Sequence, residues 1–159
     1  MILENEVHVK VPASQAWQLL GEEFGQIAQW AIPITASSLN GPVQVGTTRS
    51  CEISGFGPFQ ASTFTEELVH FDRASQSFRY EARTGLPPLM THAENHWQVE
   101  EAGPESCRVT SRAKLELAWW AWPVTPLLTF QIKRDSKGFM EQLRYRLEEG
   151  VPLPATMPQ

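Results

Sequence analysis

Few side-chain combinations in this sequence match a known catalytic pattern. It has no GxSxG nucleophile motif, no cysteine–histidine dyad, no phosphate-binding P-loop and no GxGxxG dinucleotide motif. The residues that could do chemistry are instead polar ones inside strand-like segments, at positions where alternation puts them on the same face as apolar neighbours. They are Arg49, Ser62, Glu66, Tyr80, Asn95 and Ser111. A few polar groups on an otherwise apolar face are typical of a ligand pocket.

Arg49 and Glu66 are the charged members of this inward set. Arg49 shares the parity of Cys51, and Glu66 shares that of Phe64. Because a buried charge needs a partner, the two are predicted to pair. Three roles stay open: a purely structural pair, an anchor for a ligand carboxylate, hydroxyl or carbonyl, or a general base at Glu66. Tyr80 is the other candidate catalytic acid, and its ordinary pKa of about 10 makes it a hydrogen-bond donor at neutral pH.

His92, Glu94 and His96 form an HxExH run. On a strand these side chains project to one face, so a metal site is geometrically feasible. The parity of Trp97 puts that face in solvent, so we expect no metal. No sequence motif indicates a cofactor, and none is expected.

Composition limits the partners and the compartment. The net charge is −5, with 13 basic against 18 acidic residues, so neither nucleic acid nor an anionic membrane is an expected partner. No stretch of 18 apolar residues occurs, which predicts no integral membrane contact, and the start of the chain lacks the apolar core of a signal peptide. Cys51 and Cys107 lack metal-binding spacing and are expected to be reduced thiols in a cytoplasmic protein.

The polar residues must be positioned by a sheet and one long helix. A short strand around Val7 is followed by a helix capped by Ser14 and a second short helical piece ending at Pro33. The region from about 34 to 117 predicts an antiparallel meander with strands at 47–54, 59–71, 77–82, 90–99 and 107–117. Helical spacing then predicts a helix over 126–149, with Thr125 as its cap and Gly150 at its end.

This order predicts an α+β fold in which a curved antiparallel sheet of about six to seven strands grips a long C-terminal helix, with two short helices after the first strand. The 159 residues suit a single ligand-binding domain over 1–150, followed by a mobile tail over 151–159. The oligomeric state is left open between monomer and homodimer.

Several stretches together resemble the START-related SRPBCC superfamily, whose helix-grip fold includes birch-pollen-allergen-like proteins, polyketide cyclase/dehydrase-like proteins and, more distantly, plant abscisic-acid receptors. They are VPAS at 11–14 leading into AWQLL at 16–20, FG at 24–25 through Trp30, GTTRS at 46–50 and EELVHFD at 66–72. The resemblance spans about residues 5 to 150. SGFGP at 54–58 resembles the gate loop of the hormone receptors, whereas GLPPL at 85–89 replaces their latch loop; these two loops are expected to flank an entrance. Ala31 stands where those receptors carry a ligand-binding lysine.

The resemblance implies a cavity between the sheet and the helix that holds apolar or amphipathic small molecules. Strand parity and helix spacing then give the expected lining, which is Arg49, Cys51, Ser62, Phe64, Glu66, Tyr80, Asn95, Trp97, Ser111, Leu128, Ile132 and Phe139. A void of about 300 Å³ or more is expected there.

Three functions are compatible with these features. The first is binding or carriage of a lipid-like or polyketide-like molecule. The second is a polyketide cyclase or dehydratase that uses Glu66 as acid or base, with Tyr80 as a further candidate. The third is an interaction protein whose cavity is filled by side chains. The cluster of Trp119, Trp120 and Trp122 is either a packed hinge or an exposed apolar patch for ligand entrance, dimerisation or membrane contact.

Overall fold

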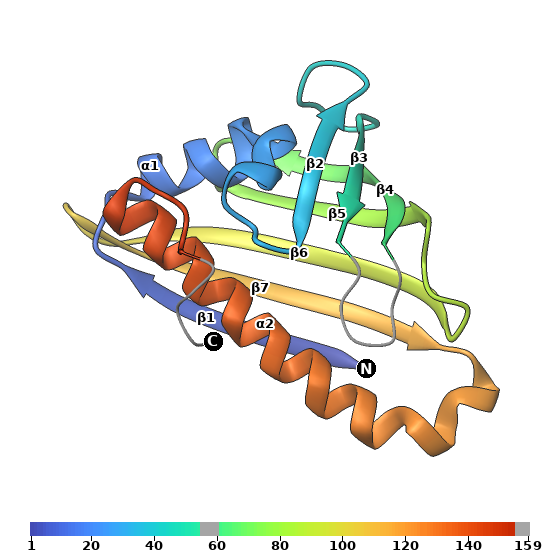
Figure 1. Ribbon diagram of the computed structural model, residues 1–159. Helices are drawn as coiled ribbons and strands as arrows, with labels where there is room; N and C mark the ends of the chain where they lie inside the picture. Colours follow the sequence, from blue (N-terminus) through green and yellow to red (C-terminus); the bar gives the residue numbers. More distant parts are fainter. Residues whose placement is uncertain (55–60, 155–159) are drawn as a thin grey trace.

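The computed structural model describes residues 1–54 and 61–154 of the chain. This part contains seven strands, four short helical segments and one long helix (Figure 1). The elements in chain order are β1 (Ile2–Val9), α1 (Ala13–Trp17), η1 (Gln18–Glu22), η2 (Phe24–Gln29), β2 (Ile34–Leu39), β3 (Thr48–Ile53), β4 (Ser62–Asp72), β5 (Ser77–Thr84), β6 (Met90–Gly103), β7 (Ser106–Leu117), η3 (Trp119–Val124) and α2 (Thr125–Glu149).

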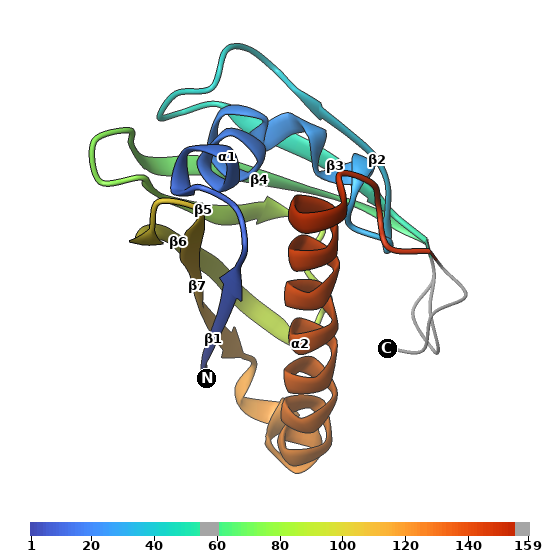
Figure 2. The same ribbon diagram turned by 90° about the vertical axis from the view of Figure 1, so that its left-hand side faces the viewer.

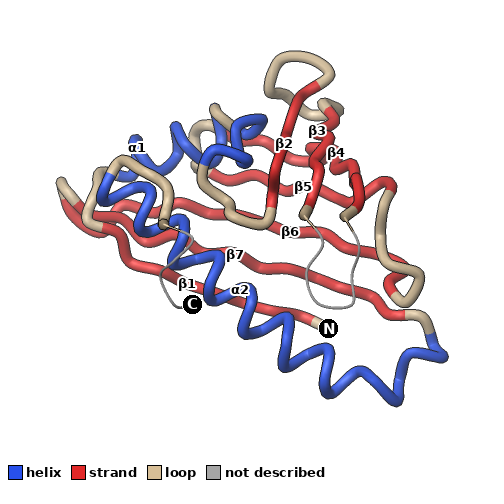
Figure 3. Tube along the Cα trace, viewed as in Figure 1, coloured by secondary structure: helices blue, strands red, loops and turns tan. Residues whose placement is uncertain are grey.

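The strands form one antiparallel sheet in the order β1-β7-β6-β5-β4-β3-β2. Each strand from β2 to β6 pairs with the next along the chain, and β1 pairs with β7, so that Val7 lies opposite Val109. The sheet curves around α2, and the helices lie on its concave side (Figures 2 and 3). The arrangement confirms the predicted α+β helix-grip fold.

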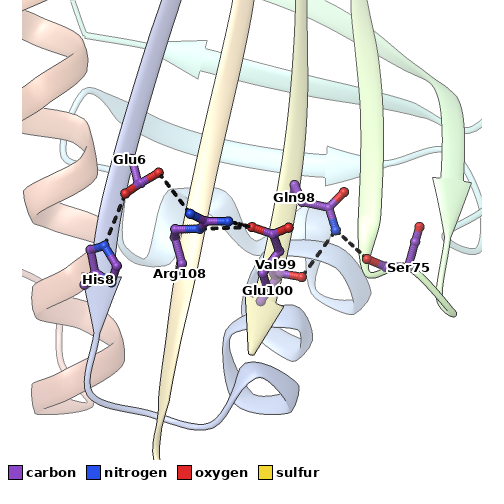
Figure 4. Close-up of polar contacts among 7 residues, drawn as sticks. All are labelled: Glu6, His8, Ser75, Gln98, Val99, Glu100 and Arg108. Atoms are coloured by element: carbon purple, nitrogen blue, oxygen red, sulfur yellow. Dashed lines mark hydrogen bonds and ion pairs between the residues drawn. The ribbon is translucent and has the colours of Figure 1, made fainter. Parts of the chain in front are cut away.

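The face of the sheet turned away from α2 carries charged side chains that pair across strands. Arg108 on β7 donates from Nε to Glu100 Oε2 on β6 at 2.9 Å, and its Nη1 lies 3.8 Å from Glu6 Oε2 on β1 (Figure 4). His8 Nε2 lies 3.1 Å from the other oxygen of Glu6. Exposed pairs of this kind stabilise a fold little, but they identify the outer face as the solvated one.

The concave face is packed where the C-terminal half of α2 covers it. Leu143 and Leu147 are buried there, and the rings of Phe78 and Trp97 stack on the sheet with centroids 6.3 Å apart. Gln142 is also buried, and its Oε1 accepts a hydrogen bond of 2.9 Å from the backbone N–H of Ile32. This bond ties the helix to the segment that follows η2.

Both helix starts differ from the predicted caps. Ser14 lies inside α1, which follows Pro12 without a side-chain cap. Thr125 is the first residue of α2, and its hydroxyl donates to the carbonyl of Ala121 at 3.1 Å because η3 leads directly into the helix. The predicted end is confirmed: Gly150 adopts a φ of 75°, the left-handed conformation that closes many helices.

The first strand is longer than predicted, and one strand was not identified from the sequence. β1 begins at Ile2 because its pairing with β7 continues to Lys114, while β2 pairs with β3 without a strong alternating pattern of its own. β4 begins at Ser62; residues 59–60 of the predicted strand and most of the proposed gate loop lie outside the described residues. So do residues 155–159, most of the predicted mobile tail.

Candidate functional site

Arg49 and Glu66 form a buried ion pair between neighbouring strands. They lie directly opposite each other in the β3–β4 register. Arg49 donates to Glu66 Oε2 from Nε at 3.0 Å and from Nη2 at 2.5 Å, which confirms the predicted pairing. The side chains are only 4% and 12% exposed.

The rest of the Arg49 guanidinium is also occupied by the protein. Its Nη1 donates to the backbone carbonyl of Phe24 at 2.8 Å, and its Cζ lies 3.8 Å from the centre of the Phe24 ring. Burial lowers the pKa of Arg49, but the charge interactions with Glu66, Tyr80 and Cys51 and the hydrogen bond to Glu66 together outweigh burial, so the pKa is raised. Arg49 therefore stays charged, and its Nε, Nη1 and Nη2 all donate to acceptors within the protein. A ligand anion would have to displace one of these contacts.

Three further polar residues form a line of hydrogen bonds across the inner face of three adjacent strands. Ser111 on β7 donates to Asn95 Oδ1 on β6 at 2.9 Å, and Asn95 Nδ2 donates to the hydroxyl of Tyr80 on β5 at 3.4 Å. We call these three residues the polar row. Burial and the nearby Glu66 charge raise the pKa of Tyr80, so its hydroxyl keeps its proton at neutral pH. Tyr80 also borders the ion pair, because its ring centre lies 5.2 Å from Arg49 Cζ.

The space around the ion pair is almost filled. A cavity beside Arg49 admits the centre of a water molecule over only about 10 Å³. That is room for one water at most. Its lining includes Phe24, Ile27, Trp30, Arg49, Tyr80, Trp97 and Phe139. The void of about 300 Å³ or more predicted between the sheet and the long helix therefore does not extend to the charged pair, because the Phe24 ring and the aromatic residues of the core fill the space there.

Larger hollows lie along the N-terminal half of α2. One of about 500 Å³ separates this half from β1, and its lining is mostly polar or charged: Ile2, Leu3, Glu4, Asn5, Arg112, Lys133, Ser136 and Lys137. Another of about 400 Å³ lies where β7 leads into η3 and α2. These volumes fall in the range of small-molecule sites. Asn5, which sequence reasoning missed, faces the larger hollow and pairs with Ser111 in the β1–β7 register, next to the polar row.

The inward side chains of α2 are more deeply buried in its C-terminal half than in its N-terminal half, where the hollows lie. Met140, Leu143 and Leu147 are buried, whereas Leu128 and Ile132, on the side that faces the sheet, are only half-buried. The inward residues Ala113, Leu115 and Leu117 of β7 are also half-buried. The inner face thus combines a closed core at one end with a half-buried apolar surface at the other.

The remaining predicted lining residues are distributed unevenly. Cys51 and Trp97 are buried in the core, and burial raises the pKa of the Cys51 thiol to about 11. Phe64 is half-buried, while Ser62 has inward parity but is exposed at the first residue of β4. Phe139 is half-buried and packs on Trp30, with ring centres 5.0 Å apart.

The HxExH run lies on the solvated face of β6, as its parity predicted. His92 Nε2 lies 3.5 Å from Glu94 Oε2, while His96 stacks against His70 with ring centres 6.2 Å apart. Over residues 1–54 and 61–154, no group of three or more histidine, cysteine or acidic residues is placed to hold a metal ion.

This geometry is that of a helix-grip protein, with an inner sheet face covered by one long helix. Residues 2–148 match the family described as "Polyketide cyclase / dehydrase and lipid transport", and the chain belongs to that family. The match confirms the resemblance to the SRPBCC superfamily. A comparison with curated proteins gave no match.

Solved structures share the fold at low sequence identity. The di-domain ARO/CYC protein BexL of the BE-7585A biosynthetic pathway is 12% identical with a TM-score of 0.77; the match covers 91% of this chain and 45% of BexL, so the chain spans less than half of that protein. The ZhuI aromatase/cyclase of Streptomyces sp. R1128 is 15% identical with a TM-score of 0.74 over 96% and 99% of the two chains. Norcoclaurine synthase of Thalictrum flavum, in complex with dopamine and hydroxybenzaldehyde, is 18% identical with a TM-score of 0.70 over 92% and 85%.

Proposed function

We propose that this protein binds a small apolar or amphipathic molecule on the inner face of its sheet, beneath the N-terminal half of α2. The observation that carries the proposal is the polar row of Tyr80, Asn95 and Ser111 on an inner face whose apolar residues Leu115, Leu117, Leu128 and Ile132 are only half-buried. Asn5, which pairs with Ser111 in the β1–β7 register, lines the neighbouring hollow of about 500 Å³. Apolar area supplies affinity there, and a few polar groups orient the ligand.

The expected ligand is neutral at the end that meets the polar row. Arg49 is enclosed by Glu66 and Phe24, so it offers no free cation to a carboxylate. Tyr80 donates through a hydroxyl that stays protonated, and Asn95 and Ser111 supply both donors and acceptors. Hydroxyl and carbonyl groups of a lipid-like or polyketide-like molecule fit this set.

The test has two parts. Native mass spectrometry of the protein purified under mild conditions should show a co-purified small molecule and identify its chemical class. Titration with Nile red, a neutral apolar dye that carries a carbonyl group, should give saturable binding. Tyr80→Phe should weaken that binding by about two- to tenfold, because one hydrogen bond contributes roughly 0.5–1.5 kcal/mol. Ser62→Ala, at an exposed position, is the control and should bind as the parent does. No co-purified molecule together with no saturable dye binding would overturn the proposal.

A polyketide cyclase or dehydratase is the second candidate, and two observations favour it. The family is described by that activity, and the Tyr80 hydroxyl is held protonated beside a carboxylate. The close contact with Arg49 counts against Glu66 as a general base, since two charge-assisted hydrogen bonds already occupy its Oε2.

Glu66→Gln separates the two candidates because it keeps the shape and removes the charge. Incubation of the parent with a linear poly-β-ketone substrate should leave the substrate unchanged if the protein only binds it. A cyclised or dehydrated product that forms with the parent and falls about 100-fold or more with Glu66→Gln would establish the enzyme instead.

A further inference from the structure

Several large apolar side chains are exposed on η3 and the first turns of α2. We call Trp119, Trp120, Trp122, Val124, Leu127 and Phe130 the tryptophan patch. Trp119, Trp120 and Trp122 are 86%, 51% and 74% exposed, and the other three are exposed as well. The patch accounts for six of the nine large apolar residues that lie exposed in the described part of the chain. The packed-hinge alternative for the tryptophans is therefore wrong.

The tryptophan patch lies at one end of the molecule. η3 and the start of α2 project past the end of β7 and form a protruding tip in both perpendicular views (Figures 1 and 2). Within residues 1–54 and 61–154, none of the three exposed indole N–H groups has a hydrogen-bond partner. An aromatic ring with an apolar body and a free N–H is suited to a boundary that is apolar on one side and polar on the other.

The charge around the patch differs from that of the whole chain. The net charge of the protein is −5, yet no acidic residue occurs between Glu116 and Asp135. Directly behind the patch, α2 carries Lys133, Arg134 and Lys137, all exposed. Neither lysine has an ion-pair partner in the described residues. The tip of the molecule is thus apolar and flanked by cationic groups.

We propose that the tryptophan patch docks this protein on the surface of a lipid bilayer that contains anionic headgroups. The indoles and Leu127 enter the boundary between headgroups and acyl chains, and Lys133 and Lys137 meet the headgroup charges. A second copy of the chain fits less well, because a two-fold contact through this protruding tip would bring equal basic groups together. The contact is peripheral: none of the helices in the described residues is apolar over a stretch that could span a membrane.

Docking at this end would also serve the proposed ligand site. The hollow of about 400 Å³ is lined by Trp119 and Trp122 of the patch and by Leu117, an inward residue of β7. An amphipathic molecule could pass from the bilayer through this hollow toward the inner face of the sheet. This last step rests on the proposed function, whereas the docking itself does not.

Vesicle binding of the full chain tests the docking. The protein is mixed with vesicles of phosphatidylcholine alone, or of phosphatidylcholine and phosphatidylglycerol at two to one, and the bound fraction is measured by co-sedimentation. We expect binding to the mixed vesicles that weakens as salt is added. Brominated lipid should quench tryptophan fluorescence, and the quenched emission should come from the exposed indoles, because Trp17, Trp30 and Trp97 are buried.

Three variants identify the surface. Trp119→Ser/Trp122→Ser should reduce the partition constant about tenfold or more, since both indoles lose their burial in lipid. Lys133→Gln/Lys137→Gln should reduce binding to the mixed vesicles by roughly fivefold per lysine and leave binding to phosphatidylcholine unchanged. Val45→Ser removes an exposed apolar residue in the turn between β2 and β3, and should bind as the parent does. All three change exposed residues, so their thermal unfolding should match that of the parent.

Absence of binding to mixed vesicles would overturn the proposal, as would binding that Trp119→Ser/Trp122→Ser leaves intact. A concentration-dependent dimer that the same variant dissociates would also overturn it and assign the patch to contact between copies. Vesicle binding without any Nile red binding would support the docking and reject the ligand site, so the two proposals fail separately.

Discussion

At the scale of single residues, the inner face carries the buried pair of Arg49 and Glu66 and, beside it, the polar row. The guanidinium of Arg49 meets Glu66, the carbonyl of Phe24 and the face of the Phe24 ring. Tyr80 lies beside this cluster and belongs to the polar row as well. We infer that Arg49 and Glu66 hold the strands together, while Tyr80 and Asn95, both half-buried, are the members of the polar row that a ligand can reach; Ser111 is buried.

Replacement of Arg49 by methionine should leave the buried Glu66 carboxylate without its ion-pair partner. Breaking one half of a buried pair costs about 3–5 kcal/mol, so the free energy of unfolding should fall by that amount in a denaturant titration. The matched control is Arg83→Met, because Arg83 pairs with Glu67 and Glu81 at the surface. Its loss should stay below about 1 kcal/mol. Equal unfolding midpoints for Arg49→Met and the parent would show that the pair carries no stability.

His96 should make the protein less stable in mild acid. Partial burial and the nearby His70, Arg79 and Arg112 lower the pKa of His96 in the folded state. The unfolded chain therefore binds the proton at a higher pH than the folded chain does. The stability contributed by neutral His96 is complete above a pH of about 6.5 and is lost as the pH falls toward the lower, folded pKa. Unfolding titrations at pH 7.5 and at pH 5.5 should show a smaller drop for His96→Gln than for the parent; an equal drop would remove His96 as the cause.

At the scale of elements, α2 has two halves with different roles. Its C-terminal half covers the core through the buried Leu143 and Leu147, whereas Leu128 and Ile132 in its N-terminal half are only half-buried. Under the proposed function, the same helix supplies stability at one end and a binding surface at the other.

Two leucine substitutions on α2 should separate these roles. Leu143→Ala leaves a cavity in a closed core and should cost about 2–5 kcal/mol in unfolding free energy. Leu128→Ala, the matched change in the open half, should cost about 1 kcal/mol or less because the leucine is already partly solvated. Leu128→Ala should nevertheless weaken Nile red binding. A similar stability loss for both variants would mean that the N-terminal half is packed as tightly as the core.

At the scale of the whole molecule, the two cysteines report on global unfolding. Cys51 and Cys107 are free, fully buried and on different strands, and burial raises the pKa of each thiol. A buried, protonated thiol reacts slowly. Ellman's reagent should therefore modify neither thiol in the native protein and both in denaturant. Rapid labelling of the native protein would show that the sheet opens locally at β3 or β7.

Much of the fold follows from local periodicity, which the sequence determines by itself. Alternation placed Arg49, Glu66 and Tyr80 on the inner face and His92 and His96 on the outer one, since side-chain direction along a strand depends only on counting residues. The rule fails where a strand is irregular. At the β6–β7 shift between Met90 and His92, Met90 instead of Thr91 lies opposite Leu117, and no residue type in this stretch announces that shift.

The space between the elements was decided only by the tertiary structure. Whether a void surrounds Arg49 depends on where the Phe24 ring and the Phe24 carbonyl lie, and both belong to a short helical segment far from β3 in the sequence. Likewise, the identity of Trp119 and Trp122 is compatible with a packed hinge or an open patch. Their exposure follows from how far η3 projects past the sheet (Figure 1). The face to which a strand side chain points is a local property of the chain. Cavities and exposed patches depend instead on the distances between elements, which are set by the packing of all the elements together.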